Sequence, residues 1–273
     1  MYKILIAFAL VATTFSSTNA QTKTKKKTTK TVPPKKALSN PDTSATKKVP
    51  TQTDNTANSL AESIKSLTKG GKLSATDITS GLREALQVGA SNASKKLSAV
   101  DGFFGNAALK ILMPPEAEKV EKTLREYGRG QDVDDAILSM NRAAEDAAKS
   151  ATPIFISAIQ GMSITDAVGI LKGTDTAATG YLRDKTTAQL TETFKPVIQQ
   201  SLDKVNATSY WGTITNYYNK IPFVKKINTD LAAYVTEKTL AGLFTTVAIE
   251  EQKIRKDPVA QTTDILKKVF GGK

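Results

Sequence analysis

The stretch MSITDAVGILKGTDTAATGYLRDKTT (Met162–Thr187) holds the densest series of helix start and stop signals in the chain. Ser163, with an aspartate three residues later, has the pattern of a capping box. Gly173 can end that helix, and Thr174 or Asp175 can cap the next one at once. The stretch therefore predicts two helices that meet at a tight corner, which we take as the organising joint of an all-α domain.

The rest of residues 59–273 is helical in its periodicity, with apolar residues recurring every three to four positions between Gly and Pro breaks. We expect one all-helical domain of about eight to ten helices, including a short helix at 60–67 and a final helix at 259–270. Residues 208–223 are the one segment with strand character, and helix is favoured because no second strand is available. We expect Asn228-Thr229 to cap the last long helix.

Two features predict how the core is filled. Phe103 and Phe104 lie in a glycine-flanked break and are expected to enter the core from a loop. The helix that carries Ala144 and Ala148 is rich in alanine along one stripe, which predicts close approach of neighbouring helices.

The N-terminal residues predict export. Residues 1–20 have one lysine, a short apolar run and small residues before Gln21, the pattern of a signal peptide cleaved near Ala20. The alternative is an uncleaved anchor, which the shortness of the apolar run disfavours. We expect a periplasmic or secreted mature protein without a transmembrane helix.

Residues 21–58 are a Lys/Thr/Pro-rich segment of low complexity, with nine lysines and two aspartates. Too few apolar residues are present to offset the entropy of ordering, so we expect a disordered linker. This linker carries +7 of the net +12, and with Lys3 removed as well only +4 remains for residues 59–273. The linker could hold an anionic envelope surface, although a solvated spacer is the favoured interpretation. The mild charge of the folded part argues against nucleic-acid binding.

The chain has no cysteine and no histidine. Disulfides, thiolate chemistry, imidazole catalysis and His- or Cys-ligated metals are therefore excluded. Carboxylate, lysine or hydroxyl chemistry remains available, but the composition favours a protein that is not an enzyme.

Polar residues at two places form a candidate cluster. Three of them share one helix face, where an intrahelical ion pair at the edge of the core is the simpler interpretation. The others surround the corner, where we expect the arginine to act as a clasp with one of the aspartates. The candidates are Asn141, Arg142, Glu145, Lys172, Asp175, Arg183 and Asp184. The run Lys172–Asp175 is similar to the Gly-Thr-acid loops of annexin-type calcium sites, but only one incomplete copy is present, so no metal or other cofactor is expected.

Several segments together resemble one family. They are LSMNRAAE (138–145), GILKGTDTAATGYLRDKT (169–186), FKPVIQQSLDKV (194–205), YNKIPFV (218–224), YVTEKTLAGLF (234–244) and IRKDPVAQTTDILKKVFG (254–271). They look like the exported bacterial family catalogued as domain of unknown function 4197. The resemblance implies an envelope location and a helical fold, and it implies no activity, substrate or catalytic residue. Members are often lipoproteins, and this chain departs from that pattern because it lacks cysteine.

Three functions stay open. The leading hypothesis is a non-enzymatic envelope protein that acts by binding or as a structural module. The second is a carrier of an apolar ligand such as lipid held between helices. Its expected lining would be the aromatic residues Phe155, Tyr210, Trp211, Tyr217, Phe223 and Phe244, although ordinary core packing is the simpler interpretation of them. The third, a hydrolase using paired carboxylates such as Asp175 and Asp184, needs two acids to converge in a cleft.

Overall fold

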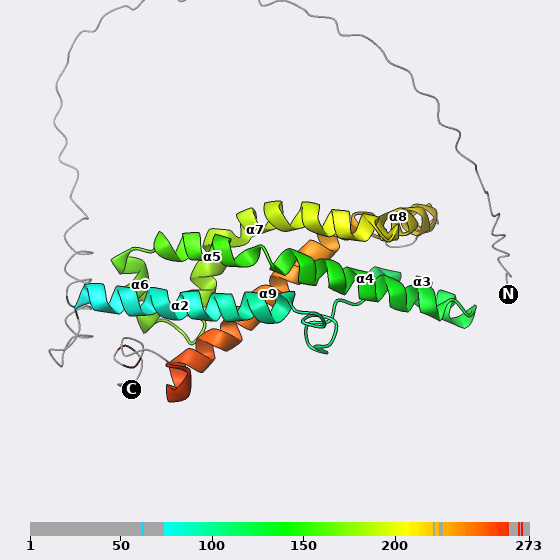
Figure 1. Ribbon diagram of the computed structural model, residues 1–273. Helices are drawn as coiled ribbons and strands as arrows, with labels where there is room; N and C mark the ends of the chain where they lie inside the picture. The colour runs from blue at the N-terminus through cyan, green and yellow to red at the C-terminus, as the bar shows by residue number, and fades with distance from the viewer. Residues whose placement is uncertain are drawn as a thin grey trace, which may run out of the picture. The chain divides into compact units, whose positions relative to one another are not determined.

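The computed structural model describes residue 62 and residues 74–220, 222–223, 226–261, 267 and 269, all within one compact unit, residues 51–273. These residues form helices and loops without a strand, which confirms the predicted all-α class (Figure 1). The α-helices are α2 (Ala75–Ser98), α3 (Glu118–Glu126), α4 (Gly130–Ala148), α5 (Ala151–Gln160), α6 (Ile164–Lys172), α7 (Ala177–Asp203), α8 (Ala207–Tyr218) and α9 (Leu231–Lys256).

Four of the sequence predictions concern residues that lie wholly or mostly outside the described ranges. The signal peptide at 1–20, the linker at 21–58, nearly all of the helix at 60–67 and most of the helix at 259–270 lie outside the described residues.

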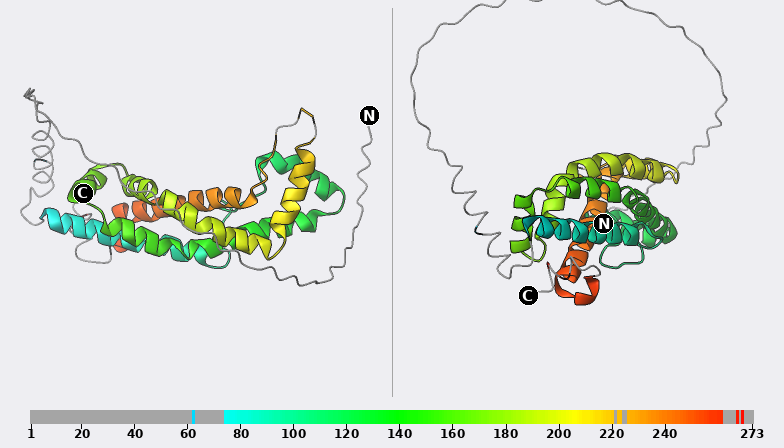
Figure 2. Two further views of the ribbon diagram at one scale, coloured as in Figure 1. Left: turned by 90° about the horizontal axis from the view of Figure 1, so that it is seen from above. Right: turned by 60° about the vertical axis from the view of Figure 1, so that its left-hand side comes forward.

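The long helices pack on one another around α9, which contacts α2, α4 and α7 (Figures 1 and 2). α4 packs in turn against α2 and α7. Ala143, Ala144, Ala147 and Ala148 of α4 are fully buried. The predicted close approach at the alanine-rich half of α4 is therefore confirmed, because such short side chains let neighbouring backbones come near.

The loop after α2 fills the core with one aromatic residue rather than two. Phe103 is fully buried, and its ring lies where a side chain on Gly242 of α9 would be: a Cβ there would come within 2.6 Å of Phe103 Cε1. Phe104 is only partly buried, and Lys110 Nζ lies 4.0 Å from the centre of its ring. The prediction is correct for Phe103 and holds in part for Phe104, which packs against the edge of the core while Lys110 lies over its ring.

The sequence correctly predicts a helix at α8 but places the N-cap of α9 on the wrong residues. The ambiguous segment 208–223 does contain a helix, α8, as expected. The predicted cap of α9 is wrong: Asp230, not Asn228 or Thr229, is its N-cap and accepts a hydrogen bond from Ala233 N at 2.8 Å. Asn228 Oδ1 instead accepts from Asp230 N at 2.9 Å, so it orders the residue that caps the helix.

Within the described residues, no single helix is long and apolar enough to cross a membrane. One bent pair, Gly130–Gln160 with Ile164–Lys172, meets the criterion of length and composition across a bend of 107°. Its helices α4, α5 and α6 each bury apolar residues in the common core.

Candidate binding site

The α6 side of the corner is built as the sequence predicts. Ser163 Oγ accepts from Asp166 N at 3.1 Å, and Asp166 Oδ2 accepts from Ser163 N at 2.9 Å, which completes the capping box. Hydrogen bonds from the Ser163 side chain and backbone hold the pKa of Asp166 below its ordinary value. Gly173 follows α6, and a Cβ on it would lie 2.6 Å from Ala177 Cβ, so the turn requires glycine.

The α7 side is capped from another helix. The N-cap residue Thr176 makes no side-chain cap bond, so the predicted cap by Thr174 or Asp175 is wrong. Glu251 of α9 supplies the acceptors instead: its carboxylate accepts from Ala178 N at 3.0 Å and from Thr179 N at 2.8 Å. It also accepts from Thr179 Oγ1 at 2.8 Å. A buried negative charge at a helix N-terminus satisfies backbone donors and complements the helix dipole.

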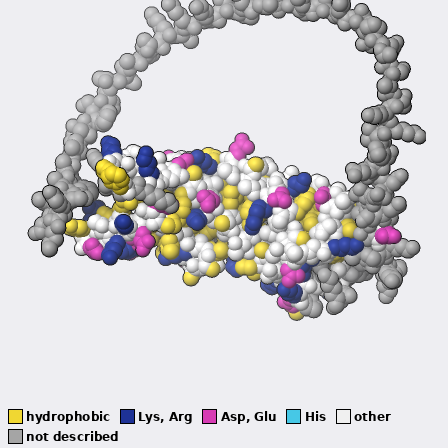
Figure 3. Space-filling view, turned by 180° about the vertical axis from the view of Figure 1, so that it is seen from behind, with side chains coloured by type: hydrophobic (Ala, Val, Ile, Leu, Met, Phe, Trp, Pro, Cys, Tyr) yellow, Lys and Arg dark blue, Asp and Glu magenta, His cyan; other side chains and the backbone are white. Residues whose placement is uncertain are grey.

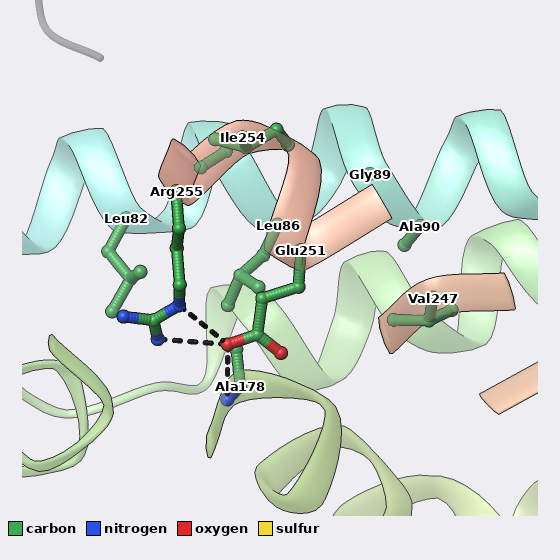
Figure 4. A pocket seen from close by; sticks show the side chains of 10 residues that line it. Leu82, Leu86, Gly89, Ala90, Ala178, Val247, Glu251, Ile254 and Arg255 are labelled. Carbon is green, nitrogen blue, oxygen red and sulfur yellow. Dashed lines mark hydrogen bonds and ion pairs between the residues drawn. The ribbon is translucent and has the colours of Figure 1, made fainter. Parts of the chain in front are cut away.

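Arg255 completes this junction, one turn along α9 from Glu251. Its Nε and Nη2 donate to Glu251 Oε1 at 3.0 and 2.8 Å (Figure 4). Nη2 also donates to the carbonyl of Ile170, in the last turn of α6, at 2.9 Å. The pair therefore ties the end of α6 and the start of α7 to α9. The Glu-Arg spacing of four in a charged stretch is the sequence signal for this junction, but the same spacing also fits an exposed helix face.

The corner residues chosen from the sequence do not take part in the Glu251–Arg255 junction. The Asp175 carboxylate pairs with Lys256 Nζ at 2.5 Å on the exposed surface. Lys172 and Asp184 are exposed side chains. Arg183 does not form the predicted clasp with Asp175 or Asp184: its guanidinium lies over the ring of Phe244, 5.3 Å from the ring centre. An arginine does clasp the corner, as expected, but it is Arg255 and not Arg183.

The helical cluster on α4 also holds a loop. Glu145 is buried, and its Oε1 accepts from Phe103 N at 3.1 Å and from Phe104 N at 3.2 Å. Arg142 donates to Glu145 Oε2 at 2.6 Å and to Asp101 Oδ1 at 2.8 Å. The expected ion pair within the helix is present, and its carboxylate additionally fixes the loop that places Phe103 in the core.

Asn141 does the same for the next part of that loop. Its amide group accepts from Ile111 N at 2.8 Å and donates to Ile111 O at 2.8 Å. The side chain has no exposed surface. Asn141 thus satisfies both backbone groups of a buried loop residue, which identifies its role as structural.

The interior leaves little space for a ligand near this junction. The cavity bordered by Leu86, Gly89, Glu251 and Arg255 measures about 10 Å³ (Figure 4). That is about the space taken by one water molecule. A ligand carried inside the core between α2 and α9 therefore has no room at this place.

Of the six aromatic residues proposed as a ligand lining, the five whose side chains the structure describes fall into a buried group and an exposed group. Phe155 and Phe244 are buried and pack edge to face, with ring centres 6.1 Å apart. Trp211 is buried and donates from Nε1 to Asn228 O at 3.1 Å, which ties α8 to the loop before α9. Tyr210 and Phe223 are exposed, and the side chain of Tyr217 lies outside the described residues. The core interpretation is correct for the buried three.

A surface groove of about 380 Å³ does lie beside the corner, between α7 and α9. Its floor and rim combine apolar groups, hydroxyls, one amide and one cation. They come from Thr176, Thr179, Gly180 and Arg183 of the α7 side and from Phe244, Thr245, Ala248, Ile249 and Gln252 of α9.

Arg183 is the chemical feature of this groove. Its guanidinium stacks over Phe244 and, within the described part of the chain, has no hydrogen bond or ion pair, so its five N–H donors remain available. No acidic residue is among those that line the groove. Gly180 leaves the wall open, since a Cβ there would meet no heavy atom within 4 Å. We refer to this feature as the Arg183 groove.

Among the described residues, no group of three or more Asp and Glu side chains is placed to hold a metal ion. Comparison with curated proteins gives no match, and comparison with solved structures gives none either. The family model described as "Protein of unknown function (DUF4197)" matches residues 72–271. This range includes α2 to α9, the loop that Glu145 holds and the start of α7 that Glu251 caps. The chain belongs to the DUF4197 family.

Proposed function

We propose that this protein is a non-enzymatic binding protein of the bacterial envelope, exported by its N-terminal leader. Its ligand, in this proposal, is a molecule with an apolar body and one anionic head group, held in the Arg183 groove. The observation that carries the proposal is the unpaired Arg183 guanidinium stacked on Phe244 at the edge of a groove of about 380 Å³.

The chemistry of the groove supports this ligand class. An arginine offers parallel N–H donors to a carboxylate or phosphate, and stacking on an aromatic ring restricts its conformations in advance. Ala248 and Ile249 offer apolar contact, while Thr245 and Gln252 can orient polar atoms of the head group. The volume falls in the range of small-molecule sites, which are mostly apolar with a few polar groups.

Binding is better supported than hydrolysis by carboxylates. Among the described residues two carboxylates are buried, Glu145 and Glu251, and each is engaged by two backbone N–H donors and an arginine. Asp175 is paired with Lys256 outside the groove. Substituting Asp175 and Asp184 with Asn tests the hydrolase alternative, which predicts loss of a hydrolytic activity with unchanged ligand binding.

The groove can be blocked without disturbing the core. Gly180→Leu adds a side chain into open space and replaces a helical glycine, which favours the folded state by up to about 1 kcal/mol. Gly169→Leu is the matched control, because Gly169 is also an exposed helical glycine with open space at its Cβ.

Titration calorimetry with decanoate, decyl phosphate and decanol tests the proposal. We expect saturable binding of decanoate and decyl phosphate to the wild type and to Gly169→Leu, and none to Gly180→Leu. Arg183→Gln should bind the anions no better than decanol, because the charge that distinguishes them is gone. Equal binding to the wild type and to Gly180→Leu contradicts the proposal.

Export has a separate test. The mass of the protein purified from its own host should correspond to a chain that begins at Gln21. A retained leader would contradict cleavage near Ala20 and leave the groove proposal unaffected.

A further inference from the structure

The loop between α8 and α9 combines a fixed base with an exposed apolar tip. Asn219, just beyond α8, uses its side chain to close the loop: Oδ1 accepts from Ile227 N at 2.7 Å, and Nδ2 donates to Ile227 O at 2.8 Å. Ile227 itself is buried. This pairing brings residues 219 and 227 together and fixes the base of the segment that carries Phe223.

Phe223, preceded by Pro222, is the exposed aromatic residue of this segment, and we call it the tip. Phe223 has a relative exposure of 106%, so its ring projects as far into solvent as it would in a short extended peptide. Its φ is +64°, a left-handed backbone conformation that a bulky aromatic residue rarely adopts. A strained backbone that exposes a phenyl ring brings no benefit to folding, and such strain gathers at functional positions.

The charges around the tip are basic. Lys220 and Lys226 are exposed on either side of it, and residues 219–228 contain no acidic residue. Figure 3 shows hydrophobic side chains among Lys and Arg side chains at the end of the unit that carries α8. An aromatic tip between lysines suits a lipid bilayer surface, where the ring enters the interface and the lysines stay at the head groups.

From this geometry we propose that Phe223, with Lys220 and Lys226 beside it in the sequence, inserts into the surface of a bilayer rich in anionic phospholipid. A protein partner fits the loop less well, because a stable interface needs roughly 800 Å² from each side and a single protruding ring offers far less. Residues 21–58 carry +7 in the same chain, and in this proposal their charge would add to the attraction of the lysines beside Phe223, since two weak signals together give stable association. The proposal does not depend on the Arg183 groove.

Vesicle co-sedimentation of the full mature chain tests it, with vesicles of phosphatidylglycerol and phosphatidylethanolamine and with phosphatidylcholine vesicles as the neutral reference. Phe223→Asn removes the ring and keeps a residue that tolerates positive φ. Tyr127→Asn is the matched control, because Tyr127 is a similarly exposed aromatic residue, 79% exposed, at the end of α3. We expect Phe223→Asn to lower the partition coefficient onto anionic vesicles about tenfold, and Tyr127→Asn to leave it unchanged.

The charge is tested with Lys226→Gln, against Lys172→Gln as an exposed lysine elsewhere. The first should lower anionic-vesicle binding about fivefold and the second should not. In Phe223→Trp, brominated lipids should quench the fluorescence of the introduced indole, since Trp211 is buried and its emission changes little. Binding that is equal for wild type and Phe223→Asn would assign it to the linker alone and overturn the proposal. Emission of the Phe223→Trp variant that stays unquenched in the presence of bound vesicles would overturn it too.

Discussion

Removing the carboxylate of Glu251 tests how the corner is held. In Glu251→Ala, Ala178 N and Thr179 N lose their acceptor at the start of α7, and Arg255 loses its counter-charge. The Arg255 side chain is only 7% exposed, so its charge is left in a poorly solvated place.

The cost follows from these three losses. Each buried donor left without a partner costs about 1–3 kcal/mol, and breaking a buried ion pair from one side costs about 3–5 kcal/mol. Because the losses share one carboxylate and Arg255 keeps its bond to Ile170 O, they do not add fully. We expect about 3–5 kcal/mol of lost stability, which corresponds to a fall in Tm of roughly 6–20 °C for a domain of this size.

Urea denaturation followed by circular dichroism measures this change. Glu237→Ala is the control, because Glu237 is an exposed glutamate on the same helix and should cost no more than about 0.5 kcal/mol. Glu251→Gln keeps the acceptor oxygen and should fall between the two. If Glu251→Ala cost less than about 1 kcal/mol, the assignment of Glu251 as the cap of α7 would be refuted.

Three further predictions concern the other fixed points. Asn141→Ala leaves Ile111 N and O unpaired in the core and should destabilise by about 2–4 kcal/mol in the same urea assay; a loss below about 0.5 kcal/mol would contradict the structural role. Gly242→Ala should cost about 1–3 kcal/mol, because the new methyl group meets Phe103, while Gly212→Ala has open space and should be neutral or stabilising; equal effects would refute the contact. The pKa of Asp166 is lowered in the folded state, so the stability from its ionised form is present above the ordinary value of 3.8 and is lost as pH falls through the lower folded value. Asp166→Asn should therefore lose about 0.5–2 kcal/mol at pH 7 and show a smaller decline in Tm below pH 4; an unchanged acid profile would count against the capping box.

The helices are predictable from local information. Ser163 and Asp166 are three residues apart, so their capping box is visible in the sequence and forms as expected. The alanines of α4 likewise reveal a close-packed face, because a helical repeat of small residues has few other uses.

The hydrogen bonds that join segments distant in the sequence are not predictable from local information. Glu251 caps a helix more than seventy residues earlier in the chain, and its spacing of four from Arg255 also fits an exposed helix face. Asn141 and Glu145 stand out as a polar group on one helix face, but the loop backbone that they hold carries no side-chain signal. When a side chain bonds to a backbone group, only the side chain can be recognised in the sequence, because the backbone partner could belong to any residue.

The groove is predictable only in part. Its position in the corner makes Arg183 a candidate, but its contact with Phe244 depends on how α7 crosses α9. Gly180 does not stand out in the sequence, because glycine is tolerated within a helix. The open space beside it becomes part of a groove only when α9 packs next to α7, which the sequence does not show.

The most direct test of the binding function is an NMR titration of the ¹⁵N-labelled mature protein with decanoate. We expect saturable shifts of the backbone amides that border the Arg183 groove, in residues 176–183 and 244–252, with much smaller changes in α3 and α8. The same titration of Gly180→Leu should leave those amides unmoved. Shifts that do not saturate, or that gather away from α7 and α9, would contradict the assignment of this groove as the binding site.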